Sequence, residues 1–204
     1  MRIFRRCTIL ALALMLALAT AALADNYFVN IEMATSEDIR QALSFTLDGA
    51  TYTLPCTLQD FYDQGWAARN PEQLENNVLE PMYSAGQYLD KDGKSVWIDL
   101  ANFTEEDVRM DAASVDSIHI VPEMAPDFAL ASGITCASTA DEILAAYGTE
   151  YADDMSGKND LDIQFNLEGE SSTYNSITFR YGFDNQILPD AVAEEIWVSC
   201  ILTD

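Results

Sequence analysis

Histidine is the side chain that most often moves protons in active sites, and this chain of 204 residues has one, His119. His119 stands in a stretch of alternating apolar and polar residues, with no nucleophile motif beside it. The sequence has no G-x-S-x-G motif, no paired histidines at zinc spacing and no glycine-rich phosphate loop. A single histidine also removes the commonest zinc sites. The residues therefore indicate no catalytic histidine, no metal centre and no cofactor.

Carboxylates are the other candidate chemical groups, because the chain has 34 Asp and Glu residues. The stretches 90–93 and 153–160 resemble calcium loops, but they lack the required oxygen spacing and the terminal bidentate Glu. Glu105, Glu106 and Asp107 could act as acid and base in a glycosidase, although carboxylates at this density lie near one another by chance. We therefore interpret these stretches as solvated turns. A secreted carboxylate-based hydrolase stays an alternative function.

Two tryptophans are better candidates for a binding surface. Trp97 and Trp197 each stand between two β-branched apolar residues, so each ring points away from those neighbours if the segments are strands. Exposed aromatic rings on an open sheet face are typical of binding hot spots. The alternative is that each ring closes a second core layer or a junction between two units of the chain. We predict that Trp97 and Trp197 are binding residues.

The first 24 residues have the pattern of a signal peptide. It begins with three arginines at positions 2, 5 and 6, continues with an apolar run over 9–18 and ends with a small-x-small triplet at 22–24. We expect cleavage after Ala24 and no membrane insertion once the signal is removed. The predicted localisation is secreted, extracellular or in the cell envelope.

The charge of the chain favours some partners over others. Removing residues 1–24 changes the formal net charge from −24 to −27. A negative field of this size repels nucleic acid and anionic membranes and attracts basic partners. A highly soluble extracellular protein without any specific partner has the same property. We predict a basic protein or peptide as the partner and no nucleic acid.

Turn and cap residues divide the chain into short elements. Asp48-Gly49 predicts a hairpin over 45–55, and Asp92-Gly93 predicts another between strands over 82–89 and 95–100. Helices are expected over 57–65, capped by Thr57, and over 138–148, capped by Ser138 or Thr139 and ended by Gly148. Further strands are expected over 115–121, 161–168, 174–183 and 195–202. Because connections this short cannot carry parallel crossovers, the predicted class is α+β with antiparallel sheets.

These elements occur in the same order twice. Gly65 and Ser117 are 52 residues apart, as are Gly148 and Cys200, and a shift of 83 residues aligns the two pairs without gaps. The sequence therefore predicts two tandem repeats of a short helix packed on an antiparallel sheet, which either form two small cores or share one continuous sheet. The predicted divisions are a signal peptide over 1–24, an N-terminal arm over 25–44, a first repeat over 45–122 and a second repeat over 123–204.

Three cysteines remain after export, an odd number for an oxidising compartment. Cys56 and Cys136 each precede an expected helix, and Ser117 stands in the first repeat where Cys200 stands in the second. If a repeat joins its helix entry to its last strand, the disulfide is Cys136–Cys200. Cys56 is then a small buried hydrophobe rather than a reactive thiol.

The stretches 133–139 and 142–149 carry a resemblance to a known family. Gly-Ile-Thr-Cys-Ala-Ser-Thr followed by Glu-Ile-Leu-Ala-Ala-Tyr-Gly-Thr resembles the helix entry of proteins with the beta-lactamase inhibitory protein fold, a tandem repeat of helix-plus-four-stranded-sheet units. This chain has Glu150 where that pattern has Pro. The resemblance covers most of residues 45–202, and its motifs are structural, so it carries over no functional residue.

These observations together favour binding over catalysis. We expect a secreted, non-enzymatic bacterial module, inhibitor-like in its action, that presents a sheet face to a protein or peptide partner. The alternatives are the hydrolase described above and an envelope-associated structural module.

Overall fold

The computed structural model describes residues 41–125, 127–148, 152–154, 162–167, 174–181 and 187–201. The predicted signal peptide, most of the N-terminal arm and most of the acidic stretch 153–160 lie outside these residues. The described residues form a mixed structure with a large antiparallel sheet and few helices, so the α+β class is confirmed. No helix among them is long and apolar enough to cross a membrane.

The predicted hairpin over 45–55 is confirmed. β1 (Ser44–Leu47) and β2 (Ala50–Thr53) are joined by Asp48 and Gly49, whose φ angles of 50° and 81° suit a tight hairpin turn. β10 (Phe128–Leu130) pairs with the other edge of β1, so these strands form a small three-stranded antiparallel sheet.

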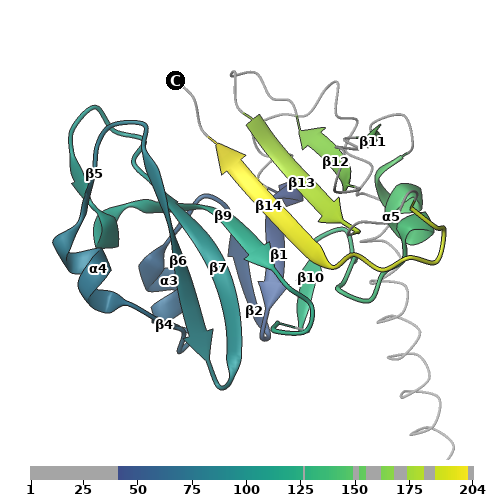
Figure 1. Ribbon diagram of the computed structural model, residues 1–204, viewed down its shortest axis with the longest axis horizontal. Coiled ribbons are helices and arrows are strands. Elements are labelled where there is room, and N and C mark those ends of the chain that lie inside the picture. The colour runs from purple at the N-terminus through teal and green to yellow at the C-terminus, as the bar shows by residue number, and fades with distance from the viewer. Residues whose placement is uncertain are drawn as a thin grey trace, which may run out of the picture.

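A nine-stranded antiparallel sheet contains most of the other described strands and runs across Figure 1. Its main path, from one edge to the other, is β11 (Ala152–Asp154), β12 (Asp162–Leu167), β13 (Tyr174–Arg180), β14 (Glu195–Ile201), β9 (Ser114–Ile120), β7 (Lys94–Ala101), β6 (Ser84–Lys91) and β4 (Ala67–Ala68). The ninth strand, β3 (Cys56–Thr57), pairs with β9 beside the end of β14. Asp92 and Gly93 turn the chain between β6 and β7 as predicted, with φ angles of 49° and 82°.

Two helices begin with the same capping arrangement. Thr57 caps α3 (Leu58–Tyr62), and Thr139 caps α5 (Ala140–Tyr147). In each cap the threonine hydroxyl oxygen accepts a hydrogen bond from the backbone N–H of the acidic residue three positions later. The carboxylate of that acidic residue accepts a hydrogen bond from the backbone N–H of the threonine. Gly148 follows α5 with a φ of 86°, which suits glycine. The described residues between β4 and β9 also include α4 (Pro71–Asn76), β5 (Val78–Leu79), β8 (Val108–Arg109) and the 3-10 turn η2 (Met110–Ala112).

One face of the large sheet is buried against the small sheet and the helices. On β7 the side chains of Val96, Ile98 and Leu100 are at most 1% exposed, and Ile196 and Val198 on β14 are equally buried. They belong to one cluster with apolar residues of β1, β2, β10, α3 and α5. The predicted alternation along these two strands is confirmed, because the tryptophan between each set of buried residues points to the opposite face and is partly exposed.

The boundary predicted near position 122 does not separate two cores. β10, from the second half of the chain, pairs with β1 from the first half, and β9 pairs with β14 in the middle of the large sheet. In Figure 1 the small sheet overlaps the centre of the large one, and both contribute to the same buried cluster. Described strands from both sides of position 122 therefore share the large sheet and one buried cluster.

Candidate functional site

The two tryptophans predicted to bind a partner are aligned across the open face of the large sheet. Trp97 on β7 pairs with His119 on β9, and Trp197 on β14 pairs with His119 from the other side. Tyr88 on β6 pairs with Trp97 in turn. Because directly paired residues point to the same face, Tyr88, Trp97, His119 and Trp197 form a single line, which we call the aromatic row.

The rings of the aromatic row contact one another. The ring centroids of Tyr88 and Trp97 lie 4.7 Å apart at an interplanar angle of 80°, an edge-to-face contact. Those of His119 and Trp197 lie 3.6 Å apart at 17°, which is a stacked pair. Both geometries are favoured between aromatic rings, and all four side chains are partly exposed. The row is therefore an ordered apolar strip that solvent reaches.

The aromatic row lines a groove of about 370 Å³. The groove is open to solvent, and its lining residues come from β6, β7, β9, β13 and β14 and from the turn after β9: Tyr88, Ser95, Trp97, His119, Val121, Met124, Arg180, Glu195 and Trp197. Met124 adds an exposed apolar side chain at the rim, at 38% exposure. A volume in this range holds a few side chains of a partner or a small ligand.

Carboxylates fix the two indole rings. Trp97 Nε1 donates to Asp99 Oδ1 at 3.0 Å, and Trp197 Nε1 donates to Glu195 Oε2 at 3.0 Å. His119 Nε2 lies 3.4 Å from Asp99 Oδ2. The indole N–H groups are thus used inside the protein, and the ring carbons are what the groove offers to a ligand.

Two guanidinium groups lie over rings of the aromatic row. Arg69 Cζ is 4.1 Å from the centroid of Tyr88, and Arg180 Cζ is 4.8 Å from the centroid of Trp197. Arg69 also donates two hydrogen bonds to Asp90, which lower the pKa of that carboxyl to about 2 together with a hydrogen bond from Ser95. Cation–π contacts of this kind stabilise both groups.

Ser95 and His119, which line the groove, are both engaged by neighbouring side chains. Ser95 is the one hydroxyl-bearing aliphatic side chain of the lining, and it donates to Asp90 and accepts from Arg69 at 2.6 Å each. The pKa of Asp90 is lowered to about 2, so this carboxylate is too weak a base to activate the hydroxyl as a nucleophile. His119 is stacked on Trp197 and faces Asp99. The prediction that His119 is a satisfied strand residue agrees with these contacts.

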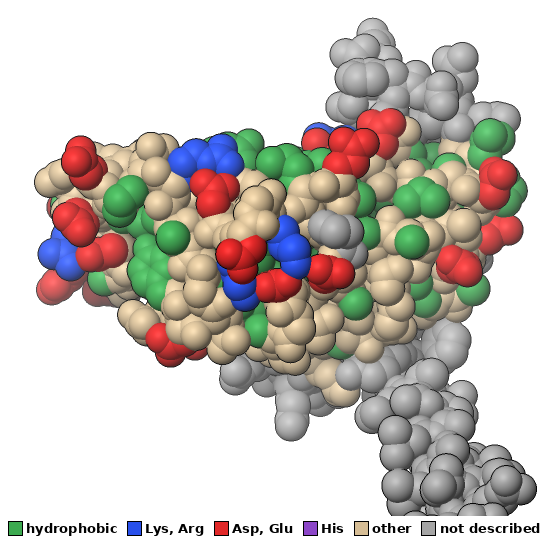
Figure 2. Space-filling view, turned by 90° about the horizontal axis from the view of Figure 1, so that it is seen from below, with side chains coloured by type: hydrophobic (Ala, Val, Ile, Leu, Met, Phe, Trp, Pro, Cys, Tyr) green, Lys and Arg blue, Asp and Glu red, His purple; other side chains and the backbone are tan. Residues whose placement is uncertain are grey.

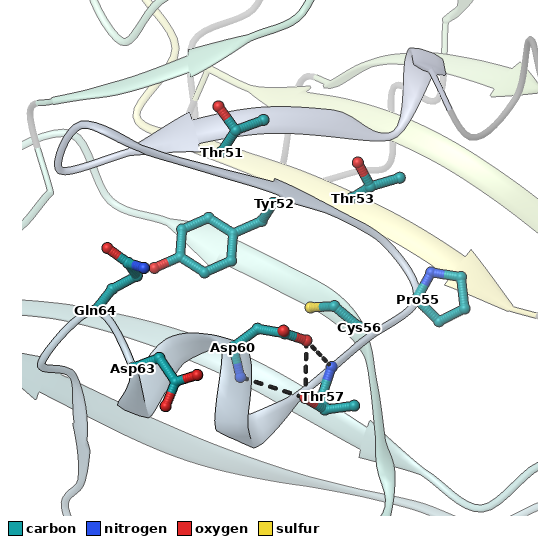
Figure 3. A pocket seen from close by; sticks show the side chains of 9 residues that line it. All are labelled: Thr51, Tyr52, Thr53, Pro55, Cys56, Thr57, Asp60, Asp63 and Gln64. Atoms are coloured by element: carbon teal, nitrogen blue, oxygen red, sulfur yellow. Dashed lines mark hydrogen bonds between the residues drawn. The ribbon is translucent and has the colours of Figure 1, made fainter.

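A second hollow, of about 440 Å³, lies between β2 and α3 (Figure 3). The Cys56 sulfur points into it, toward the space between Tyr52 and Asp60. Burial raises the pKa of the Cys56 thiol to about 12, and Asp60 adds to the shift, so the group stays a protonated thiol at neutral pH. The Asp60 carboxylate accepts hydrogen bonds from the Thr57 backbone and hydroxyl as part of the helix cap. This hollow therefore lacks an activated nucleophile.

The predicted disulfide residues lie apart from the aromatic row. Cys136 precedes α5, and its Sγ lies 3.6 Å from the carbonyl of Ala125, whereas Cys200 lies near the end of β14 on its buried side. The structure contains no disulfide between Cys136 and Cys200. Burial raises the pKa of the Cys136 thiol to about 11. The pairing stays a prediction for the protein in an oxidising compartment.

The described residues include no group of three or more His, Cys, Asp or Glu side chains placed to hold a metal ion. The stretch 90–93 forms the end of β6 and the turn to β7, and Asp90 pairs with Arg69. Glu105, Glu106 and Asp107 are exposed on the segment between β7 and β8.

The sequence analysis selected Trp97 and Trp197 as candidate binding residues but did not place them together, and it did not include Tyr88 or the position of His119 between the tryptophans. Alternation along a strand gives the face on which a residue lies. Alternation does not show which other strand lies beside it in the sheet, so no residue pattern within β9 or β14 predicts that these two strands pair.

Comparison of the chain with protein-family models, with curated proteins and with solved structures finds no match. What the groove can bind therefore has to follow from its own side chains.

Proposed function

We propose that the protein is a secreted, non-enzymatic binding module that presents the aromatic row to a protein or peptide partner. One observation carries the proposal: Trp97 and Trp197 both pair with His119, so two large rings lie within one groove on the sheet face that the core does not use. Tryptophan and tyrosine dominate hot spots because they supply large, rigid contact areas at low entropic cost.

The charge of the described surface supports a basic partner. The described residues contain five Lys and Arg side chains, and each one already pairs with an Asp or Glu of the chain: Arg69, Lys91, Lys94, Arg109 and Arg180. On the face seen in Figure 2, acidic side chains are spread over the surface, and the few basic ones lie against acidic ones. A partner with positive charge would approach faster and be held more strongly than a nucleic acid or an anionic membrane.

The proposal includes the predicted tandem repeat. α3 is followed by β4, β6, β7 and β9, and α5 is followed by β11, β12, β13 and β14, in that order from the sheet edge to its centre. The matching capping boxes of α3 and α5 support a duplication. On this interpretation, which agrees with the resemblance to the beta-lactamase inhibitory protein fold, the aromatic row crosses the junction of the two repeats, and an inhibitor-like action is the form of binding we propose.

An unbiased peptide selection tests the function. A display library of random dodecapeptides is panned on the immobilised protein, and enriched peptides are measured by calorimetry on the protein and on Trp97→Ala and Trp197→Ala variants. We expect enriched peptides whose affinity falls about tenfold or more in either variant, because a buried aromatic anchor commonly supplies that much binding energy. The matched control is Tyr83→Ala, which removes an aromatic side chain that is 63% exposed elsewhere. Peptides that bind all variants equally, or no enrichment at all, would overturn the proposal.

A further inference from the structure

The Trp197 end of the aromatic row contains a ring, a carboxylate and a guanidinium in mutual contact. Trp197 Nε1 donates to Glu195, Arg180 Nη1 lies 3.0 Å from Glu195 Oε2, and the Arg180 guanidinium covers the Trp197 ring at 4.8 Å. At the other end of the row the Arg69 guanidinium lies 4.1 Å from the centroid of Tyr88 and pairs with the carboxylate of Asp90. The face thus holds a guanidinium twice between an aromatic ring and a carboxylate, and at Trp197 the ring also donates to that carboxylate.

Trp97, between these two, has the ring and the carboxylate of the same arrangement. Its Nε1 donates to Asp99 at 3.0 Å, the same contact and distance that join Trp197 to Glu195. Within the described parts of the chain, no Lys or Arg covers the Trp97 ring or pairs with Asp99; the positively chargeable group near Asp99 is His119, 3.4 Å away. The Asp99 side chain is 28% exposed, so a cation from outside can reach it.

We propose that the open sheet face takes an arginine side chain of a basic peptide partner at Trp97, where its guanidinium lies on the indole and pairs with Asp99. Trp97 lines the groove, and Asp99 adjoins Trp97 outside that lining. This inference rests on the proposed binding function and names the chemistry of its partner. A guanidinium fits because it is planar, it stacks on aromatic rings and it pairs with a carboxylate through two parallel N–H groups. The hydrogen bond from the indole to Asp99 orients the carboxylate before the partner arrives, as it does at Glu195.

Charge complementarity favours this occupant over the others that an aromatic groove accepts. The chain has a formal net charge of −24, and the carboxylates Asp99 and Glu195 flank the rings of the groove. A second copy of this chain would bring the same negative charge to the groove, and a neutral sugar would leave the Asp99 charge unpaired. A basic peptide neutralises that charge at the ring where it stacks.

The test compares two peptides that differ in one charge. A capped Gly-Gly-Arg-Gly-Gly pentapeptide and its citrulline counterpart, which has nearly the same shape without the charge, are titrated into the ¹⁵N-labelled protein. The chain has three tryptophans, so its indole N–H signals are few and can be assigned by single substitutions. We expect the arginine peptide to shift the Trp97 indole signal and to bind on the order of tenfold more tightly than the citrulline peptide.

Two variants separate a local pair from general attraction. Asp99→Asn removes the charge and retains an oxygen that accepts from Trp97 Nε1, and we expect it to lower affinity for the arginine peptide about tenfold while leaving the citrulline peptide unaffected. Glu105→Gln removes the same charge from an exposed site outside the groove and should change neither affinity by more than about twofold.

Failure of this inference differs from failure of the proposed function. Equal binding of the two peptides, or equal losses in Asp99→Asn and Glu105→Gln, would overturn the arginine site. Selected peptides that need Trp97 and Trp197 but contain no basic residue would likewise overturn it and would leave the binding function standing. A Trp97-dependent self-association or glycan interaction with which the arginine peptide does not compete would overturn the choice of occupant.

Discussion

The Trp97 indole lies directly against the backbone of Gly86 on the neighbouring strand. A Cβ atom at Gly86 would be 1.7 Å from Trp97 Cζ2 and 2.3 Å from Cε2, closer than any real contact. Gly86 pairs with Asp99, the residue that accepts from the same indole. The absent side chain of Gly86 and the carboxylate of Asp99 together define where the central ring of the groove lies.

The first prediction concerns Gly86→Ala. The added methyl group must displace the indole, so we expect a loss of about 1–3 kcal/mol in the free energy of unfolding and a changed near-ultraviolet circular dichroism spectrum. In a Trp97→Ala background the same substitution should be neutral or slightly stabilising, because alanine is a better strand residue than glycine. A double-mutant cycle by urea denaturation measures the coupling, and additive effects would contradict the contact.

Local chemistry explains how much of the fold could be predicted. The turns at Asp48-Gly49 and Asp92-Gly93 and the caps at Thr57 and Thr139 are set by residues within a few positions, and all four are where the sequence indicated. Elements of two or three residues, such as β4, β5 and β8, are too short for the alternation of apolar and polar residues that predicts a strand.

The assembly of the groove could not be predicted in the same way. His119 and Trp197 are in register because β9 and β14 pair in the centre of the sheet, and strands far apart in sequence are matched by packing of the whole core. Alternation along each strand therefore predicts the face on which each tryptophan lies, but it does not predict that His119 lies between them.

The second prediction concerns the two helix caps. Thr57→Ala and Thr139→Ala each remove an oxygen that accepts from the third helical N–H, at 3.3 Å and 3.4 Å. We expect each substitution to lower the free energy of unfolding by about 1 kcal/mol, measured by urea denaturation. Serine at either position retains the acceptor and is the matched control; a serine variant as unstable as the alanine variant would show that the cap contributes nothing.

The third prediction concerns Cys56. Its pKa of about 12 leaves about one thiolate in ten thousand at pH 8, so in the reduced native protein we expect alkylation by iodoacetamide roughly 1,000-fold slower than at the same cysteine in the unfolded chain. Mass spectrometry of peptides after timed quenching measures the rate at each cysteine. A native rate close to the unfolded one would contradict the raised pKa.

The predicted disulfide has its own test. Peptide mapping without reductant, on protein exported by its host, shows whether Cys136 and Cys200 are joined.

The fourth prediction concerns Asp116, a carboxyl at the irregularity where β9 pairs with β7. Its side chain is 5% exposed, and burial together with the nearby Asp99 raises its pKa from 3.8 to about 7. Among the described residues, no group donates a hydrogen bond to its Oδ1. The buried carboxyl is therefore more stable protonated than ionised.

This raised pKa gives the stability a definite pH dependence. Between pH 4 and 7 the folded protein binds more protons at Asp116 than the unfolded chain does, so this group makes the free energy of unfolding fall as the pH rises through that window and leaves it level above about pH 7. The full shift corresponds to a loss of at most about 4 kcal/mol.

Asp116→Asn removes that dependence, since the amide does not ionise. We expect the variant to unfold at higher urea concentration than the unmodified protein at pH 8 and at nearly the same concentration at pH 4.5. Asp111→Asn is the matched control, because it removes a carboxylate that pairs with Arg109 near the surface and should not stabilise the protein at pH 8. If Asp116→Asn were equally or less stable than the unmodified protein at pH 8, the ionised Asp116 would not destabilise the fold, and the raised pKa would be contradicted.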